Sequence, residues 1–158
     1  MISIAAAITL TELSKRTLWR RISDGSLIRI DDNTVDDKAK ISLDAIKSNI
    51  CVPLEPEDFD LIESADAGNA EAQTDLALLF LSNAKPESAV YWLKLAVKQD
   101  YLEAMHWLGR CYTDGNGLPK NENLGIMWIA KAAAQGHVIS QGQMQTMVDR
   151  FTKNGVST

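Results

Sequence analysis

Histidine and cysteine, the side chains that most metal and redox sites require, are scarce in this sequence. The sequence has two histidines, His106 and His137, and two cysteines, Cys51 and Cys111. They are far apart in the sequence, form no Cys-x-x-Cys pair and do not have the spacing of metal ligands. We therefore expect no metal site and no cofactor, and two free thiols in a reducing compartment. The acidic residues are spread along the chain, and no catalytic set can be assembled from them, so we do not expect an enzyme.

Long hydrophobic runs are also missing. No stretch approaches the roughly 18 apolar residues that a membrane-spanning helix needs. Segment 1–13 is apolar, but it lacks the basic residues and the small-residue cleavage site of a signal peptide. The sequence thus predicts a cytoplasmic protein without a membrane partner.

Charge is divided unequally along the chain. Residues 1–50 carry 8 Lys or Arg against 7 acids, a net charge of +1, whereas residues 51–158 carry 8 against 14, a net charge of −6. An acidic surface repels a phosphate backbone. Any binding of nucleic acid should therefore be confined to the first fifty residues.

What the sequence does contain is a helical hairpin pattern in residues 102–137. Small or apolar residues recur three and four positions apart, which predicts two helices separated by a turn at 114–117, where Gly and Asn accept a left-handed backbone. The inner face of the second helix is predicted to consist of Leu124, Met127, Trp128, Ala132 and Ala133.

The same spacing recurs on both sides of this hairpin. Three residues have equivalents 32 positions earlier, in the pairs Ala72 and Ala104, Leu76 and Leu108, and Phe80 and Tyr112. A single hairpin cannot bury its apolar stripe alone, so a repeat of this length predicts stacked hairpins. A half repeat should precede them at 58–68, and a lone helix at 138–151 should close the array.

These residues resemble the Sel1-like repeat family, a relative of the tetratricopeptide repeats. The resemblance covers about residues 59–150, and 102–137 carries the Ala, Leu-Gly, Tyr, Gly-x-Gly, Trp and Ala-Ala-x-x-Gly positions of the family pattern. The earlier repeat departs from it, with Ala77 in place of Gly and a different turn. The resemblance implies a protein-binding scaffold without chemistry. Trp107 lies off the Leu108 stripe, so we expect it either to pack or to bind a protein partner.

The first fifty residues predict two helices, a strand hairpin and a short third helix. Ser3 and Ser14 are expected to cap helices at 4–9 and 15–23. Asp24-Gly25 ends the second helix, and strands are predicted at 27–30 and 40–41. Ser42 should begin a helix that runs to Ile46.

This order resembles the winged helix-turn-helix of the MerR and excisionase group over residues 2–46. The resemblance implies that helix 14–23 contacts duplex DNA, with Lys15, Arg16, Thr17 and Arg20 at the major groove and Trp19 and Arg21 at the phosphates. Free amides at a helix N-terminus favour an anion, and Arg can read guanine. The full predicted set is Ser14, Lys15, Arg16, Thr17, Trp19, Arg20, Arg21, Lys38 and Lys40. The alternatives are a solvated basic face and a Trp19 that packs against the core.

The presumed wing, residues 30–40, departs from a DNA-binding pattern. Its acids outnumber its two lysines, Lys38 and Lys40; these acids are Asp31, Asp32, Asp36 and Asp37. Acids beside a phosphate backbone weaken binding. Either the wing points away from DNA, or this region binds a protein instead.

Together these features predict a mainly α protein with a small winged helix-turn-helix domain at 1–50, a linker at 51–57 and a short α-solenoid of Sel1-like hairpins at 58–153. We expect a DNA-binding transcriptional regulator whose repeats bind a protein partner. The alternative is an adaptor that binds proteins through both domains and no DNA. A domain this small normally needs two copies on DNA, so a homodimer is left open.

Overall fold

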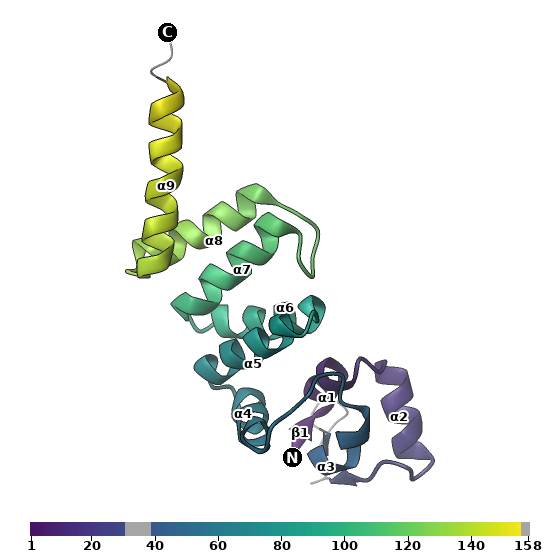
Figure 1. Cartoon of the computed structure of the whole chain (residues 1–158). Coiled ribbons are helices and arrows are strands. Elements are labelled where there is room, and N and C mark those ends of the chain that lie inside the picture. The colour runs from purple at the N-terminus through teal and green to yellow at the C-terminus, as the bar shows by residue number, and fades with distance from the viewer. Residues whose placement is uncertain (31–38, 156–158) are drawn as a thin grey trace.

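A computed structural model describes residues 1–30 and 39–155 of the chain (Figure 1). The described part is mainly helical and elongated, with helices stacked in a row between the N-terminal segment and a last helix that extends away from the others. Most of the presumed wing lies outside the described residues, including its four acids and Lys38. No helix among the residues described here combines the length and the apolar character needed to cross a membrane.

The N-terminal part consists of a small antiparallel sheet and short helices. These elements are β1 (Ile2–Ser3), α1 (Ile4–Thr11), α2 (Lys15–Ser23), β2 (Arg29–Ile30), β3 (Lys40–Ile41), α3 (Leu43–Ile46) and the 3-10 helix η2 (Lys47–Asn49). Strand β3 lies between the others, and its Ile41 stands opposite Ile2 on one side and Arg29 on the other. The predicted helices and hairpin are confirmed, while β1 was not expected.

Serine side chains fix the starts of α1 and α2. The Ser3 hydroxyl accepts a hydrogen bond from the Ala6 amide at 3.1 Å, and the Ser14 hydroxyl accepts one from the Thr17 amide at 3.1 Å. Each bond satisfies an amide that has no partner within its helix. The two predicted caps are therefore confirmed. Ser42 occupies the same position before α3 but makes no capping bond.

Six helices follow as two hairpins between two single helices. They are α4 (Pro56–Asp66), α5 (Ala70–Ser82), α6 (Pro86–Val97), α7 (Leu102–Asp114), α8 (Glu122–Ala134) and α9 (Val138–Gly155). The hairpins are α5 with α6 and α7 with α8, as the repeat spacing predicts (Figure 1). Gly68 and Gly136 end equivalent helices with φ of +105° and +101°, a conformation that favours glycine.

The second hairpin is held closely together by two glycines. A Cβ on Gly109 would lie 2.6 Å from Cγ1 of Ile129, and one on Gly125 would lie 2.4 Å from Cγ2 of Thr113. Both distances are shorter than packed atoms tolerate, so the backbones of α7 and α8 approach as only glycine permits. In the first hairpin Ala77 takes the place of Gly109 and is fully buried.

The inner face of α8 differs from the prediction. Its buried residues are Gly125, Ile129 and Ala132, whereas Leu124 and Met127 are 37% and 47% exposed. The close contact at Gly125 turns the smallest residue of the helix toward α7, and this rotation carries Leu124 and Met127 outward. The predicted stripe was therefore wrong at Leu124 and Met127.

The N-terminal part packs directly against the helical array. The buried apolar side chains form one continuous cluster that extends from Ile2 to Ala132. Polar contacts cross the same boundary: Trp92 Nε1 donates to Thr9 Oγ1 at 3.0 Å, and the Ser3 hydroxyl donates to Asp66 at 2.6 Å. The predicted linker, residues 51–57, also contacts α1 at its first residue, where the Cys51 amide donates to the Leu10 carbonyl.

Candidate functional site

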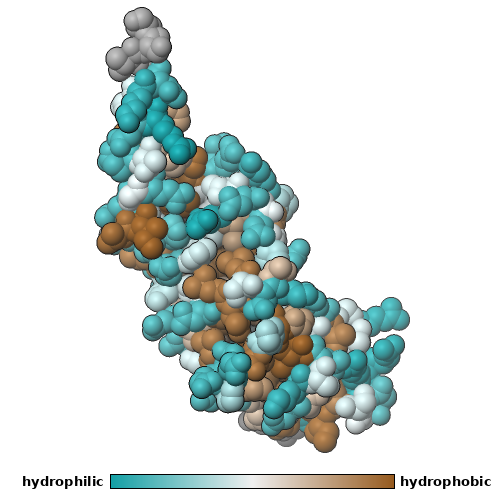
Figure 2. All heavy atoms as spheres, in the orientation of Figure 1, coloured by the Kyte–Doolittle hydropathy of each residue, from teal (hydrophilic) through white to brown (hydrophobic). Residues whose placement is uncertain are grey.

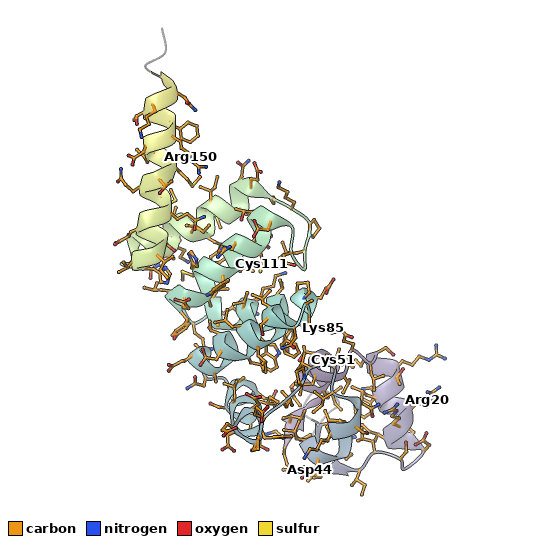
Figure 3. The ribbon with its side chains drawn as sticks, viewed as in Figure 1. Arg20, Asp44, Cys51, Lys85, Cys111 and Arg150 are labelled. Atoms are coloured by element: carbon orange, nitrogen blue, oxygen red, sulfur yellow. The ribbon has the colours of Figure 1, made fainter. Side chains whose placement is uncertain are left out.

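Helix α2 presents a basic surface to solvent. Leu18 is fully buried beneath it, while Lys15, Arg16 and Arg20 are exposed. Figure 3 shows Arg20 at the opposite end of the molecule from Arg150 on α9. Ser14 and Lys40, also in the predicted DNA-binding set, are exposed too. The cations best placed to contact an anionic partner are therefore on α2.

Three members of the predicted DNA-binding set, Thr17, Trp19 and Arg21, make contacts within the chain that the structure defines. Trp19 is half-buried against the core, and the Arg29 guanidinium lies 5.6 Å from the centre of its ring. Arg21 Nη1 donates to Asn49 Oδ1 at 2.8 Å. Thr17 is half-buried, and its hydroxyl lies 2.9 Å from that of Ser14. These contacts give the three side chains structural roles, and their contact with DNA stays a prediction.

Trp107 lies on α7 beside an open cavity of about 120 Å³ between the two hairpins. The cavity is lined by Leu81, Trp107, Arg110, Cys111, Asp114 and Asn116. Two contacts hold the half-buried indole in place: its Nε1 donates to Glu103 Oε1 at 2.7 Å, and the Arg110 guanidinium lies 5.2 Å from the ring centre. The cavity thus combines an apolar wall with a cation and a carboxylate.

Cys111, the one thiol in this cavity, is not set up as a nucleophile. The side chain is buried, and burial raises its pKa to about 11. The reactive thiolate is therefore a very small fraction near neutral pH. Figure 3 places Cys111 in the middle of the array and Cys51 near Lys85, where the N-terminal part meets α6. Both cysteines are free thiols, as predicted.

The two histidines, which the sequence places in separate elements, meet at the N-terminus of α9. His106 Nδ1 lies 2.8 Å from the Ser140 hydroxyl, and His137 Nδ1 lies 2.8 Å from the same oxygen. On its other side, His137 Nε2 lies 2.7 Å from Glu103 Oε2. We call these four side chains, Glu103, His106, His137 and Ser140, the histidine cluster.

The histidine cluster resembles an acid-histidine-serine arrangement, but its geometry is unsuited to catalysis. Ser140 is fully buried and His106 is 2% exposed, so a substrate has no access to the hydroxyl. That hydroxyl is also shared between two imidazoles. Within residues 1–30 and 39–155, no three His, Cys, Asp or Glu side chains are grouped to hold a metal ion. The cluster instead connects α7 to α9.

Sequence reasoning treated these histidines as isolated and missed the cluster. Its members lie in one repeat and the start of the next, with 34 residues between Glu103 and His137 and 34 between His106 and Ser140. That equal separation is close to the repeat length, so it indicated that these residues occupy equivalent positions in successive repeats. Whether such residues touch depends on how the helices stack, which the spacing alone does not give.

Comparisons with known proteins identify the helical array. The Sel1 repeat family model matches residues 70–101 and 102–137. The chain is similar to DAP3-binding cell death enhancer 1 of Rattus norvegicus, with 30% identity over 89 residues, which is 55% of this chain and 18% of that protein. It thus spans less than a fifth of that relative.

The comparison with solved structures also finds similarity to a Sel1 repeat protein. The chain is similar to a Sel1 repeat protein from Oxalobacter formigenes, with a TM-score of 0.50 and 28% identity over 54% of this chain and 37% of that one. The resemblance of residues 2–46 to the MerR and excisionase group stays a prediction. Residues 70–101 and 102–137, the two hairpins predicted from their spacing, are thus the part of the chain that matches the Sel1 repeat model.

Proposed function

We propose that this chain is an adaptor that binds a protein segment through its Sel1 repeats, at the cavity beside Trp107. The repeats form a rigid array of packed helices, and stacked repeats commonly present extended surfaces to protein partners. The similar rat protein is named for binding DAP3, another protein. This adaptor function was the alternative interpretation of the sequence, and the comparisons support it better than transcriptional regulation.

The observation that carries the proposal is the Trp107 and Arg110 pair at an open cavity. Trp and Arg are enriched among the residues that contribute most to protein interfaces. The bond to Glu103 and the stacked guanidinium already fix the indole, so little side-chain freedom remains to be lost on binding. A volume of about 120 Å³ is well below the roughly 300 to 1,000 Å³ of drug-sized ligand sites. The cavity is therefore suited to one protein side chain.

Peptide selection tests this proposal without a known partner. Peptides from a phage-displayed random library are selected on the full chain, and their affinities are measured by isothermal titration calorimetry. We expect Trp107→Ala to weaken the selected peptides by about 30-fold, or about 2 kcal/mol. Arg110→Ala should also weaken them, whereas Arg150→Ala on α9 should not. Peptides that bind all three variants with equal affinity would place the interface elsewhere.

A second candidate function, binding of duplex DNA by α2, is favoured by the exposure of Lys15, Arg16 and Arg20 along one helix. Fluorescence anisotropy with mixed-sequence duplexes at 50 and 200 mM salt tests it. Several phosphate contacts would make binding steeply salt-dependent, and Arg16→Ala with Arg20→Ala would remove most of it. Arg21 is left unchanged because it is bonded to Asn49. A folded chain that retains no DNA at 50 mM salt contradicts this function.

A further inference from the structure

The last helix, α9, has a small hydrophobic attachment to the array. Ser140 is its one buried residue, and three further side chains are half-buried, namely Gln143, Met144 and Met147. The rest of the helix extends beyond α8 (Figure 1). Figure 2 shows hydrophobic side chains near the base of α9 and mostly hydrophilic ones toward its tip. The polar contacts of Ser140 therefore matter to how α9 is held.

The direction of each hydrogen bond in the histidine cluster can be worked out from its partners. The Ser140 amide donates to His137 Nδ1 at 3.2 Å, so this nitrogen carries no proton and the proton of His137 is on Nε2. That proton is donated to Glu103 Oε2. The Ser140 hydroxyl can donate only once, so for both of its contacts to be hydrogen bonds it donates to His137 Nδ1 and accepts from His106 Nδ1.

His137 is therefore neutral in the intact cluster, and the hydrogen bonds are donated in one direction, from His106 to Ser140, from Ser140 to His137 and from His137 to Glu103. A proton added to His137 would occupy Nδ1, where it would face the Ser140 amide and remove the acceptor of both Ser140 bonds. A proton added to His106 would place a charge in a buried site, where the ring centre lies 5.0 Å from that of His137. Uptake of a proton by the buried His106 ring therefore opposes the arrangement that holds the start of α9.

We propose that the histidine cluster is a proton-sensitive latch, which holds α9 on α7 at neutral pH and releases it in mildly acidic solution. The latch is local, because it joins the first turn of α9 to α7 through Ser140 and His106, whereas the packing of α9 is chiefly against α8. The inference is independent of the proposed adaptor function.

The surroundings of the cluster lower the affinity of His106 for a proton while the helix is attached. Burial lowers the pKa of His106 below its ordinary value of 6.5, and the charge of Arg110, together with any charge that His137 takes up on protonation, acts in the same direction. Glu103 opposes them. Burial raises the pKa of Glu103, but hydrogen bonds from His137 and Trp107 outweigh it and keep the carboxyl ionised at mildly acidic pH. Asp75 of α5 and Tyr101 interact with Glu103 and are the other titratable groups nearby.

The sign of the pH effect follows from the lowered pKa of His106. Above pH 6.5 the imidazole is neutral whether the site is closed or open, and the latch has its full strength. Between 6.5 and the lower pKa of the closed site, the open form binds more protons, so falling pH favours opening. The carboxyl of Glu103 is protonated only below its ordinary value of 4.5, outside this window.

Hydrogen exchange of the full chain, with intrinsic rates corrected for pH, tests the latch. We expect the protection of α9 amides to fall by about tenfold between pH 7.5 and 5.0, while α5 and α6 keep theirs. In the control, His106→Asn with His137→Asn, an amide replaces each Nδ1 and takes up no proton. Its α9 protection should not change with pH. Constant protection in the native chain, or an equal fall in the double variant, overturns the proposal.

An NMR titration of the unaltered chain provides a second test if the double variant does not fold. The sequence contains two histidines, so both imidazole signals belong to the cluster. We expect the His106 signal to titrate below pH 6.5, in step with shifts of the amides at the start of α9. Titration of the imidazoles without a matching change in α9 would show that the bonds do not hold the helix.

Discussion

At the scale of single residues, α7 and α8 approach each other closely at two positions that have no side chain. Gly109 and Gly125 face each other across α7 and α8, and the room that a Cβ would need is already occupied by backbone and by Ile129 or Thr113. Gly142 in α9 is different, because nothing lies within 4 Å of a Cβ added there. The two helical glycines Gly125 and Gly142 therefore form a matched pair for substitution.

We expect Gly125→Ala to destabilise the chain by about 1 to 3 kcal/mol, because α7 and α8 must separate to admit the methyl group. Gly142→Ala should be neutral or stabilising by up to about 1 kcal/mol, because alanine has the higher helix propensity. Urea unfolding followed by circular dichroism measures both. Equal effects of the two substitutions would mean that the close approach at Gly125 does not contribute to stability.

Local rules account for most of the residue-scale features predicted from the sequence. The caps at Ser3 and Ser14 and the buried position of Leu18 depend on neighbours within one turn, so the sequence specifies them directly. Trp19 and Arg21 were assigned to DNA because of the resemblance of residues 2–46 to the MerR and excisionase group. Their contacts with Arg29 and Asn49 come from other elements, which spacing within a helix does not reveal.

At the scale of elements, the repeat spacing predicted the number and order of helices but not the rotation of each. The helical spacing of apolar residues in α8 is compatible with more than one buried face. Hydrophobicity alone therefore predicts that large residues such as Leu124 and Met127 are buried. The glycine contact decides the rotation instead. Sequence reasoning therefore did better for α7, where the repeat positions Ala104 and Leu108 are buried.

The candidate sites illustrate the same limit. Trp107 was singled out because it lies off the Leu108 stripe, and the structure places it beside a cavity. The rest of that cavity includes Leu81, from the preceding hairpin, and could not be predicted without the stacking of repeats. The histidine cluster likewise needs α9 to return to α7. A site whose residues lie in one helix can be predicted from the sequence. A site whose residues come from different repeats can be predicted only when the fold is known.

At the scale of the whole molecule, the N-terminal part and the array share a buried boundary. The loop after α1 and the start of α6 are joined by an ion pair between Glu12 and Lys85, with a distance of 2.8 Å. Thr9 accepts two further bonds, from Trp92 and from the Ser88 hydroxyl. Two parts joined in this way should unfold together, even though the sequence indicates separate domains.

We expect Trp92→Phe to destabilise the whole chain by about 1 to 3 kcal/mol, because the Thr9 hydroxyl loses a buried partner. Exchange of amides in α1 and in α6 should increase together, and thermal unfolding should remain a single transition. Trp128→Phe in α8 provides the control, since it leaves this boundary unchanged. Separate transitions for the two parts would show that the boundary does not couple them.

The shared carboxylate of Glu103 gives the molecule an internal optical reporter. One oxygen accepts from the Trp107 indole and the other faces His137, while the His106 ring lies 5.8 Å from that of Trp107 in an edge-on arrangement. A change in how α9 is attached therefore alters the surroundings of the Trp107 indole, a fluorophore that lies beside the candidate binding cavity. The sequence has four tryptophans, so we expect the Trp107 contribution to the intrinsic emission to respond both to the attachment of α9 and to occupancy of the cavity.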